Sequence, residues 1–317
     1  MKYKYKFIFI SLILFLACGC ATLYNPATER NEFIFINTKQ EVSLGKYVSD
    51  QIEMEYKFSD DKDTKQRVEE IGQKVAMVAD RKDLDYHFNV IEDKELNAFA
   101  IPGGYVYVNS GLVKAATDSE LACVLGHEIG HIAARHPAKK LESGLGYEIV
   151  MGLLLGRYVQ AEAIRGINII FNLIALGYSR NDEKLADRLG VRYTWRAGYD
   201  PNGMISFLKR LQKEVQNRGP QLNIEFLKSH PNLEERIKLI EEEINSLKNI
   251  QSWEDNVSSS INHSDTRVAE ETEVNLSDNK NLSNNFSLRI KQCPVCNKKF
   301  SPLYNFCPKD GTRLISK

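Results

Sequence analysis

The stretch from Asp118 to about Arg135 constrains the fold of this chain more than any other segment. It combines an apolar pattern at helical spacing with the string His127-Glu128-Ile129-Gly130-His131. Thr117 and Glu120 form a capping box at its start, and Pro137 marks its end. The helix is expected to be largely buried, because apolar residues recur on it at Val124, Leu125, Ile129 and Ile132. The fold must therefore give its histidine nitrogens a polar partner.

The two histidines of this helix predict a metal site. Residues four apart share one face of a helix, so His127 and His131 can bind a single ion. Neutral imidazole suits zinc, which lowers the pKa of a bound water toward about 7. Glu128 is placed to accept a proton from that water as a general base. A helix with two surface histidines is the alternative, and the apolar context favours the metal.

A third ligand must come from another segment. His136 is not expected to serve, because the metzincin pattern requires a glycine where Ala134 stands and a histidine one residue later. On a continuous helix His136 would also point about 180° away from His127. Glu183 can complete a set of two histidines and one glutamate, and Asp187 can hydrogen-bond an imidazole N–H. An ordinary solvated helix face remains the other interpretation of that spacing.

The surrounding segments predict an α+β domain that is mainly helical, with a small β-hairpin or sheet. A strand is expected at Tyr86–Val90, and Pro102-Gly103-Gly104 separates two β-rich runs, 97–101 and 105–108. Helices are expected over 64–79, 182–197, 202–215 and 232–248. Two apolar stretches, 149–155 and 167–176, are too short to cross a bilayer. We interpret them as core helices, in preference to a flap or membrane-facing segment over the site.

Residues 1–20 resemble a lipoprotein-type signal peptide. Three lysines precede the apolar run Phe7–Ala17, and small residues follow it. Within Leu16-Ala17-Cys18-Gly19-Cys20, cleavage before Cys20 fits better than cleavage before Cys18. An acylated Cys20 would hold an exported protein on a membrane of the cell envelope. The alternative is an uncleaved anchor.

The C-terminal part of the chain has a different composition. Residues 249–290 are rich in Ser, Asn, Asp and Glu, which predicts a disordered linker between the domain at 21–248 and a tail at 291–317. The tail resembles a zinc ribbon with Cys293, Cys296, Cys307 and Asp310 as ligands of a second, structural zinc. In an oxidising compartment, a disulfide between Cys293 and Cys296 is the alternative.

Charge argues against nucleic acid as a partner. Lys plus Arg and Asp plus Glu both total 42 residues, so the chain has no net positive charge. No basic run interleaved with aromatic residues occurs either. Polypeptides and a membrane surface remain the expected partners.

Several motifs in order resemble the gluzincin metallopeptidases of the HtpX, CAAX prenyl endopeptidase and BepA/LoiP type. They span about Lys46 to Leu247 and comprise Asn97-Ala98-Phe99-Ala100, His127-Glu128-Ile129-Gly130-His131, Glu183-Lys184-Leu185-Ala186-Asp187, Ala197-Gly198-Tyr199-Asp200-Pro201 and Ser229-His230-Pro231 with Glu235-Arg236. The resemblance implies a zincin-type fold for 21–248, with Glu183 as third ligand and Asp187 as its neighbour. It also implies that His230 either steadies the oxyanion or occupies the open metal position.

The resemblance implies a metalloendopeptidase of the exported, lipid-anchored branch that acts in protein quality control. Asn97, Ala98, Phe99 and Ala100 are expected to form an edge strand that pairs with the backbone of unfolded or misassembled proteins. A non-catalytic chaperone or assembly factor that uses the same cleft is one alternative. A scaffold lipoprotein whose activity lies in the Cys tail is another.

Overall fold

The computed structural model describes residues 22–145, 177–218 and 225–263, residues 150 and 152, and the tail pieces 291–292, 294, 299–300 and 315–316. The chain divides into two units, 1–241 and 242–317. The predicted signal peptide, its Cys20 and the cysteines of the tail lie outside the described residues. The signal peptide, its acylation at Cys20 and the zinc ribbon of the tail therefore stay predictions.

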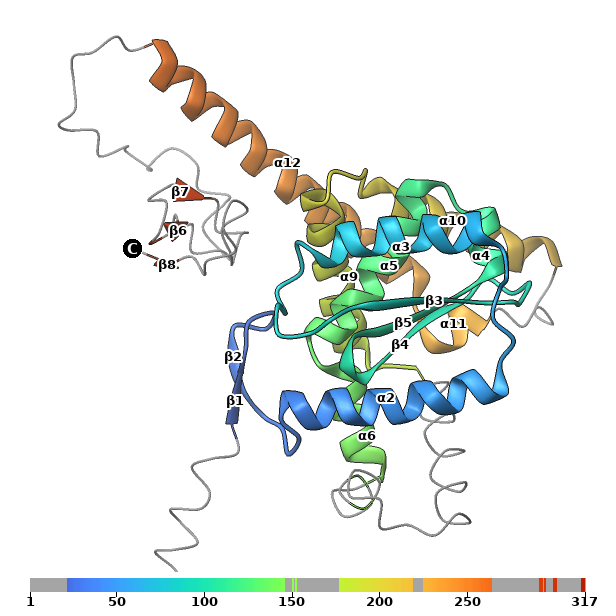
Figure 1. The fold of residues 1–317 in the computed structure, drawn as a ribbon. Helices are drawn as coiled ribbons and strands as arrows, with labels where there is room; N and C mark the ends of the chain where they lie inside the picture. Colours follow the sequence, from blue (N-terminus) through green and yellow to red (C-terminus); the bar gives the residue numbers. More distant parts are fainter. Residues whose placement is uncertain are drawn as a thin grey trace, which may run out of the picture. The chain divides into compact units, whose positions relative to one another are not determined.

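A three-stranded sheet lies at the centre of the first unit, with strand order β3-β5-β4 (Figure 1). Strand β3 (His87–Ile91) runs parallel to β5 (Tyr105–Asn109), and β4 (Ala98–Ile101) runs antiparallel to β5. The turn between β4 and β5 is the short 3₁₀ helix η2 (Pro102–Gly104), in which Gly103 and Gly104 have φ of 82° and 97°. Only glycine adopts such angles readily. The predicted hairpin is confirmed, and β4 lies at an edge of the sheet.

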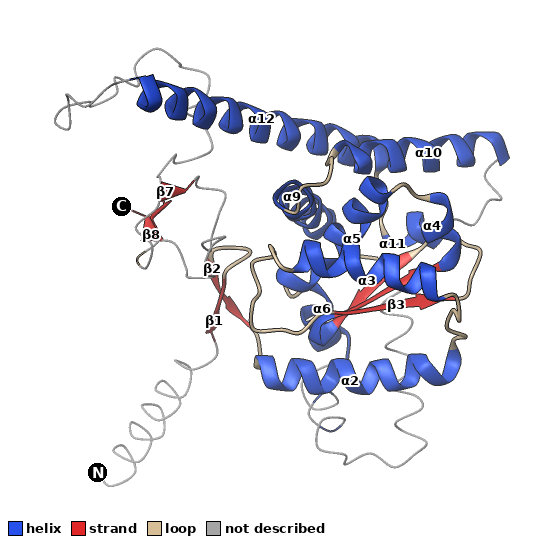
Figure 2. Ribbon diagram, turned by 45° about the horizontal axis from the view of Figure 1, so that its top comes forward, coloured by secondary structure: helices blue, strands red, loops and turns tan. Residues whose placement is uncertain are grey.

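Helices cover both faces of this sheet. Figure 2 shows α2 (Thr38–Glu55) on one side and α3 (Lys62–Ala76) and α5 (Asp118–Ala133) on the other. Side chains alternate along a strand, so Phe99 and its cross-strand partner Tyr107 face α2, where the Tyr107 hydroxyl donates to Ser49 Oγ at 2.9 Å. Ala98 and Ala100 face α5. Their small side chains allow α5 to lie close to the edge strand.

The remaining elements of the first unit surround this core. The hairpin β1 (Thr22–Asn25) and β2 (Arg30–Phe33) precedes α2, and α4 (Ser110–Ala115) leads into α5. The further helices are α6 (His136–Leu145), α9 (Arg180–Arg196), α10 (Asn202–Arg218), α11 (Glu225–Ser229) and α12 (Leu233–His263), of which α12 passes into the second unit. Helix α2 was not predicted, although Leu44, Val48 and Ile52 recur on it at four-residue spacing and are buried.

Two predicted boundaries were wrong. Helix α5 ends at Ala133, short of Arg135, which has a positive φ of 59°. Helix α12 continues to His263, into the predicted linker. No Pro or Gly interrupts 249–263, and extending an existing helix costs far less than starting one.

The second unit beyond α12 contains three two-residue strands, β6 (Lys291–Gln292), β7 (Lys299–Phe300) and β8 (Ile315–Ser316), in the order β7-β6-β8. The zinc ribbon remains a prediction. Of the apolar stretches 149–155 and 167–176, only residues 150 and 152 are described, so their interpretation stays open. Within the described ranges, no helix has both the length and the apolar composition needed to cross a bilayer. The predicted fold, mainly helical with a small sheet, is confirmed.

Candidate metal centre

Close packing of α9 on α5 brings the site together. A Cβ atom on Gly130 would lie 2.9 Å from the Ala186 carbonyl oxygen, and one on Gly190 would lie 2.9 Å from the His127 backbone nitrogen. Both distances are below any normal contact, so only glycine permits this approach. Helix α9 starts with a capping box formed by Ser179 and Asp182, and Glu183 lies on its first turn. Because the two helices lie so close together, Glu183 reaches the two histidines of α5.

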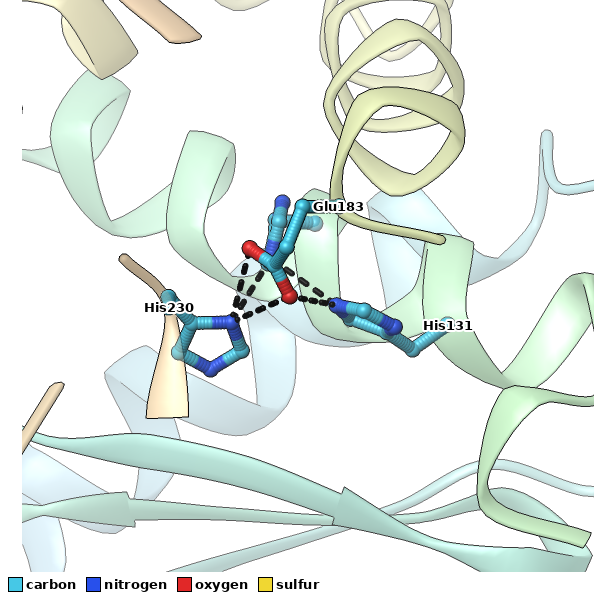
Figure 3. Close-up of side chains that lie close together, drawn as sticks. His131, Glu183 and His230 are labelled. Atoms are coloured by element: carbon cyan, nitrogen blue, oxygen red, sulfur yellow. Dashed lines mark hydrogen bonds and ion pairs between the residues drawn. The ribbon is translucent and has the colours of Figure 1, made fainter. Parts of the chain in front are cut away.

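Four side chains converge on one buried point. His127 and His131 from α5, Glu183 from α9 and His230 after α11 each offer a ligand atom, and these atoms all lie within 4.8 Å of one another. His127 Nε2 lies 3.0 Å from His131 Nε2 and 3.2 Å from His230 Nδ1. The Glu183 carboxylate points at the ring nitrogens of His131 and His230 (Figure 3), at 3.2 Å and 3.0 Å. The cluster contains both predicted histidine ligands, the predicted carboxylate and His230.

These residues fit a zinc ion. Ligand atoms about 2.0–2.1 Å from a tetrahedral zinc are separated from one another by roughly 3.3 Å, and the distances above lie near that value. Burial lowers the pKa of His131 to about 3 and also lowers that of His127, so both rings are neutral and offer lone pairs. Burial would raise the pKa of Glu183, but His230 and the adjacent imidazole of His131 lower it well below its usual range. Two neutral imidazoles and one carboxylate are a typical zinc donor set.

Glu128 lies beside this cluster and is not part of it. It is fully buried, and neither carboxylate oxygen has a well-oriented hydrogen-bond partner among the described residues. Burial raises its pKa to about 7, which His230 and the nearby backbone N–H of Ala100 partly oppose. His230 Nε2 lies 3.5 Å from Glu128 Oε1. A buried carboxylate without a well-oriented hydrogen bond is costly, and a pKa near neutrality suits a group that takes up and releases a proton.

The side of His127 that faces away from the cluster contacts the buried ion pair of Asp187 and Arg236. His127 Nδ1 lies 2.9 Å from Asp187 Oδ1, so Asp187 contacts an imidazole nitrogen of the cluster. Arg236 on α12 donates from Nε and Nη2 to the two oxygens of Asp187, at 2.8 Å and 2.7 Å. Burial would raise the pKa of Asp187, but the Arg236 charge lowers it to about 2. No role was predicted for Arg236, although its position shortly after the Ser229-His230-Pro231 motif could have indicated one.

His136 is not among the four converging side chains, and the predicted direction of its own side chain was wrong. Because α5 ends at Ala133 and Arg135 turns the chain, His136 starts α6 and comes back toward the site. Its Nδ1 lies 2.9 Å from His131 Nδ1. His136 is therefore a buried neighbour of a candidate ligand.

The edge strand β4 lies next to Glu128. Asn109 donates its N–H to Asn97 O at 2.9 Å, so these two residues form a hydrogen-bonded pair of the ladder. Directions alternate along an antiparallel strand, so the backbone N–H and C=O groups of Ala98 and Ala100 point away from β5. The predicted strand residues thus direct alternate backbone groups to the sheet edge beside the site.

The sequence of this chain is similar to those of known peptidases. Residues 62–244 match the family described as peptidase family M48. The β-barrel assembly-enhancing protease of Escherichia coli (strain K12) is 29% identical over 232 residues, which is 68% of this chain and 46% of that protein. The mitochondrial metalloendopeptidase OMA1 of Saccharomyces cerevisiae is 29% identical over 243 residues, 69% of this chain and 70% of that protein.

A crystal structure of S. mikatae Ste24p is also similar, with 17% identity, a TM-score of 0.35 and coverage of 64% of this chain and 55% of that one. The chain spans less than half the length of the β-barrel assembly-enhancing relatives that it matches.

Proposed function

The chain belongs to peptidase family M48, and we propose that it is a zinc metalloendopeptidase. The observation that carries this proposal is the buried cluster of His127, His131 and Glu183, with the carboxylate of Glu128 beside it, which has no well-oriented hydrogen-bond partner among the described residues. The cluster supplies three protein ligands, and Glu128 supplies a base. A structural zinc site would have no use for this second carboxylate, which is not a ligand.

The chemistry assigns a separate role to each side chain. A zinc ion held by His127, His131 and Glu183 would act as a Lewis acid toward the scissile carbonyl and lower the pKa of water. Glu128 takes the proton of the attacking water and passes it to the departing amine nitrogen. Asp187 fixes the tautomer of His127 by accepting from Nδ1–H, which leaves Nε2 for the metal. Arg236 keeps Asp187 ionised in a buried place.

His230 is proposed to occupy the fourth position of the site when no substrate is bound. Its Nδ1 lies 3.0 Å and 3.1 Å from the two oxygens of Glu183, within the ligand cluster. Burial would lower the pKa of His230, but the Glu183 carboxylate raises it, which favours the protonated ring that can donate to an oxyanion; a ring bound to zinc must be neutral. A histidine that leaves this position on substrate binding can then donate to the oxyanion, so the two predicted roles are compatible.

Removing the metal tests the proposal. The full-length protein, stripped with a chelator and dialysed, is expected to lose cleavage of an unfolded protein such as reduced casein. Equimolar zinc is expected to restore it, whereas magnesium is not, because two imidazoles and one carboxylate suit zinc and magnesium prefers oxygen ligands. Cleavage that persists with less than about one-tenth of an equivalent of residual zinc would refute the proposal.

The substrate is proposed to pair with β4 as an added strand. Ala98→Pro removes a backbone N–H that points to the open edge and leaves the pairing of Phe99 with Tyr107 intact. One such hydrogen bond contributes about 0.5–1.5 kcal/mol, so kcat/KM for an extended peptide is expected to fall roughly threefold to tenfold. The fall is expected in KM, with zinc content unchanged.

Phe99→Pro is the comparison variant, because it removes an N–H that points into the ladder and should also lower the melting temperature. Equal kcat/KM for Ala98→Pro and wild type on long peptides would count against strand addition.

The clients are proposed to be unfolded or misassembled proteins of a bacterial cell envelope. Backbone pairing at an edge strand makes little demand on side chains, which suits such substrates. The lipoprotein-type segment at 1–20, with Cys20 as acylation site, supports an exported protein held on a membrane surface. The similarity to proteases named for β-barrel assembly is consistent with that location.

A further inference from the structure

The ring of His131 is held on three sides. Its Nε2 faces the ligand cluster, 3.0 Å from His127 Nε2. Its face stacks on Tyr178, with ring centroids 4.0 Å apart and planes inclined by 22°. Its remaining nitrogen, Nδ1, lies 2.9 Å from His136 Nδ1, and all three histidines are buried. His131 therefore has a partner at Nδ1 as His127 does, but the partner is an imidazole where His127 has a carboxylate.

The metal role of Nε2 determines where the protons lie. A ligand nitrogen must offer its lone pair, so neutral His131 carries its proton on Nδ1. That N–H needs an acceptor, and the nitrogen 2.9 Å away can accept only if His136 carries its own proton on Nε2. His136 Nε2 lies 3.3 Å from Asp182 Oδ1, on the residue before Glu183. We infer that His136 is a positioning residue of the zinc site, which accepts from His131 Nδ1–H and turns its own N–H toward Asp182.

A strained turn holds His136 in this place. Arg135, in the left-handed region at φ 59°, breaks the path of α5 and redirects the chain. Its guanidinium is buried and pairs with Glu41 on α2 at 2.6 Å. Arg81 binds the same carboxylate through Nη1 at 3.0 Å and 2.9 Å. Buried ion pairs with Glu41 thus connect the turn to α2. The left-handed conformation of Arg135 changes the direction of the chain, and this places His136 next to His131.

The arrangement couples two metal ligands. His136 touches His131 on one side and the first turn of α9 on the other, where Asp182 belongs to the capping box of the helix that carries Glu183. Partners of this kind orient a ligand ring, and their loss lowers metal affinity by about 10- to 100-fold. This inference rests on the proposed function only in taking His131 as a zinc ligand.

Two amide variants separate positioning from packing. In His136→Asn, the side-chain oxygen can take the place of Nδ1 and still accept from His131. In His136→Gln, the amide nitrogen can take the place of Nε2 and reach Asp182, but His131 loses its acceptor. Zinc affinity of the full-length apo-proteins is measured by competition with a chromophoric chelator, and the absorption spectrum of Co²⁺ reports ligand geometry.

We expect His136→Asn to bind zinc within about threefold of wild type and His136→Gln to bind 10- to 100-fold more weakly, with an altered Co²⁺ spectrum. Tyr193→Phe is the control. It removes a buried hydrogen bond of 2.9 Å to Asp80 from the same helix α9, away from the site, and zinc affinity should not change.

Equal affinities of the Asn and Gln variants, whether both normal or both reduced, would overturn the inference. Failure of the wild type to bind zinc would instead refute the proposed function. The two failures are therefore distinct. Both variants are amides of similar polarity, so a general loss of stability would lower the zinc affinity of both alike. Such an equal loss would count against a positioning role for His136.

Discussion

Glu128→Gln is expected to lower kcat by about 10²- to 10⁴-fold, the usual contribution of a general base, while zinc content stays at one equivalent per active site. Gln has nearly the same shape as Glu but cannot take the proton of the attacking water. Glu128 is not a member of the ligand cluster, so the substitution is expected to leave zinc binding unchanged. Zinc content by mass spectrometry and cleavage of reduced casein, measured on the same sample, check both halves of this prediction.

The fold should tolerate this change. Neither oxygen of Glu128 has a well-oriented partner among the described residues, so the substitution removes a buried charge without breaking a hydrogen-bond network. We expect a melting temperature equal to or above that of wild type. Loss of activity can then be assigned to chemistry, because neither folding nor metal binding has changed.

Glu183→Gln is the matched variant, since it makes the same replacement on a ligand. It is expected to lose zinc and activity together, because an amide oxygen is a far weaker zinc ligand than a carboxylate. Equal cleavage by wild type and Glu128→Gln would refute the role of Glu128 as general base. Intact zinc in Glu183→Gln would show that the third ligand has been misassigned.

Arg236→Met is expected to have the largest effect on stability, lowering the free energy of unfolding by about 3–5 kcal/mol. Arg236 is 2% exposed and donates to both oxygens of Asp187, and its Nη1 lies 3.5 Å from Glu183. Without Arg236, the buried carboxylates of Asp187 and Glu183 would repel each other, and only histidines would remain as their partners. Urea denaturation of the full-length protein, followed by circular dichroism, measures the change.

Two further variants make this expectation specific. Lys184→Met removes an exposed ion pair with Glu235 on the same pair of helices, where the two side chains are 38% and 46% exposed, and should cost less than about 1 kcal/mol. Asp187→Asn combined with Arg236→Met should be less destabilising than the sum of the single changes, because it also removes the charge that Arg236 compensates. A loss below 1 kcal/mol for Arg236→Met alone would contradict the role assigned to this ion pair.

Some of the site can be predicted from sequence because it depends on local spacing. His127 and His131 lie four apart on a capped helix, and so do Glu183 and Asp187, and the period of a helix alone puts each pair on one face. The hairpin of β4 and β5 follows in the same way from two β-rich runs around Pro102-Gly103-Gly104. Each of these features is decided within about twenty residues.

The sequence by itself thus determined the helix that carries His127 and His131, the position of the proposed base Glu128, the candidate carboxylate and the edge strand. Only the tertiary structure decided how the site is supported. The turn at Arg135 depends on an ion pair with Glu41, 94 positions earlier in the chain, and Arg236 reaches Asp187 across 49 positions. No periodicity records such contacts, because buried ion pairs and strained turns form only when packing overrides local preference. His136 shows the difference most clearly. A continuous helix would point its side chain away from His127, but the turn at Arg135 places it next to His131.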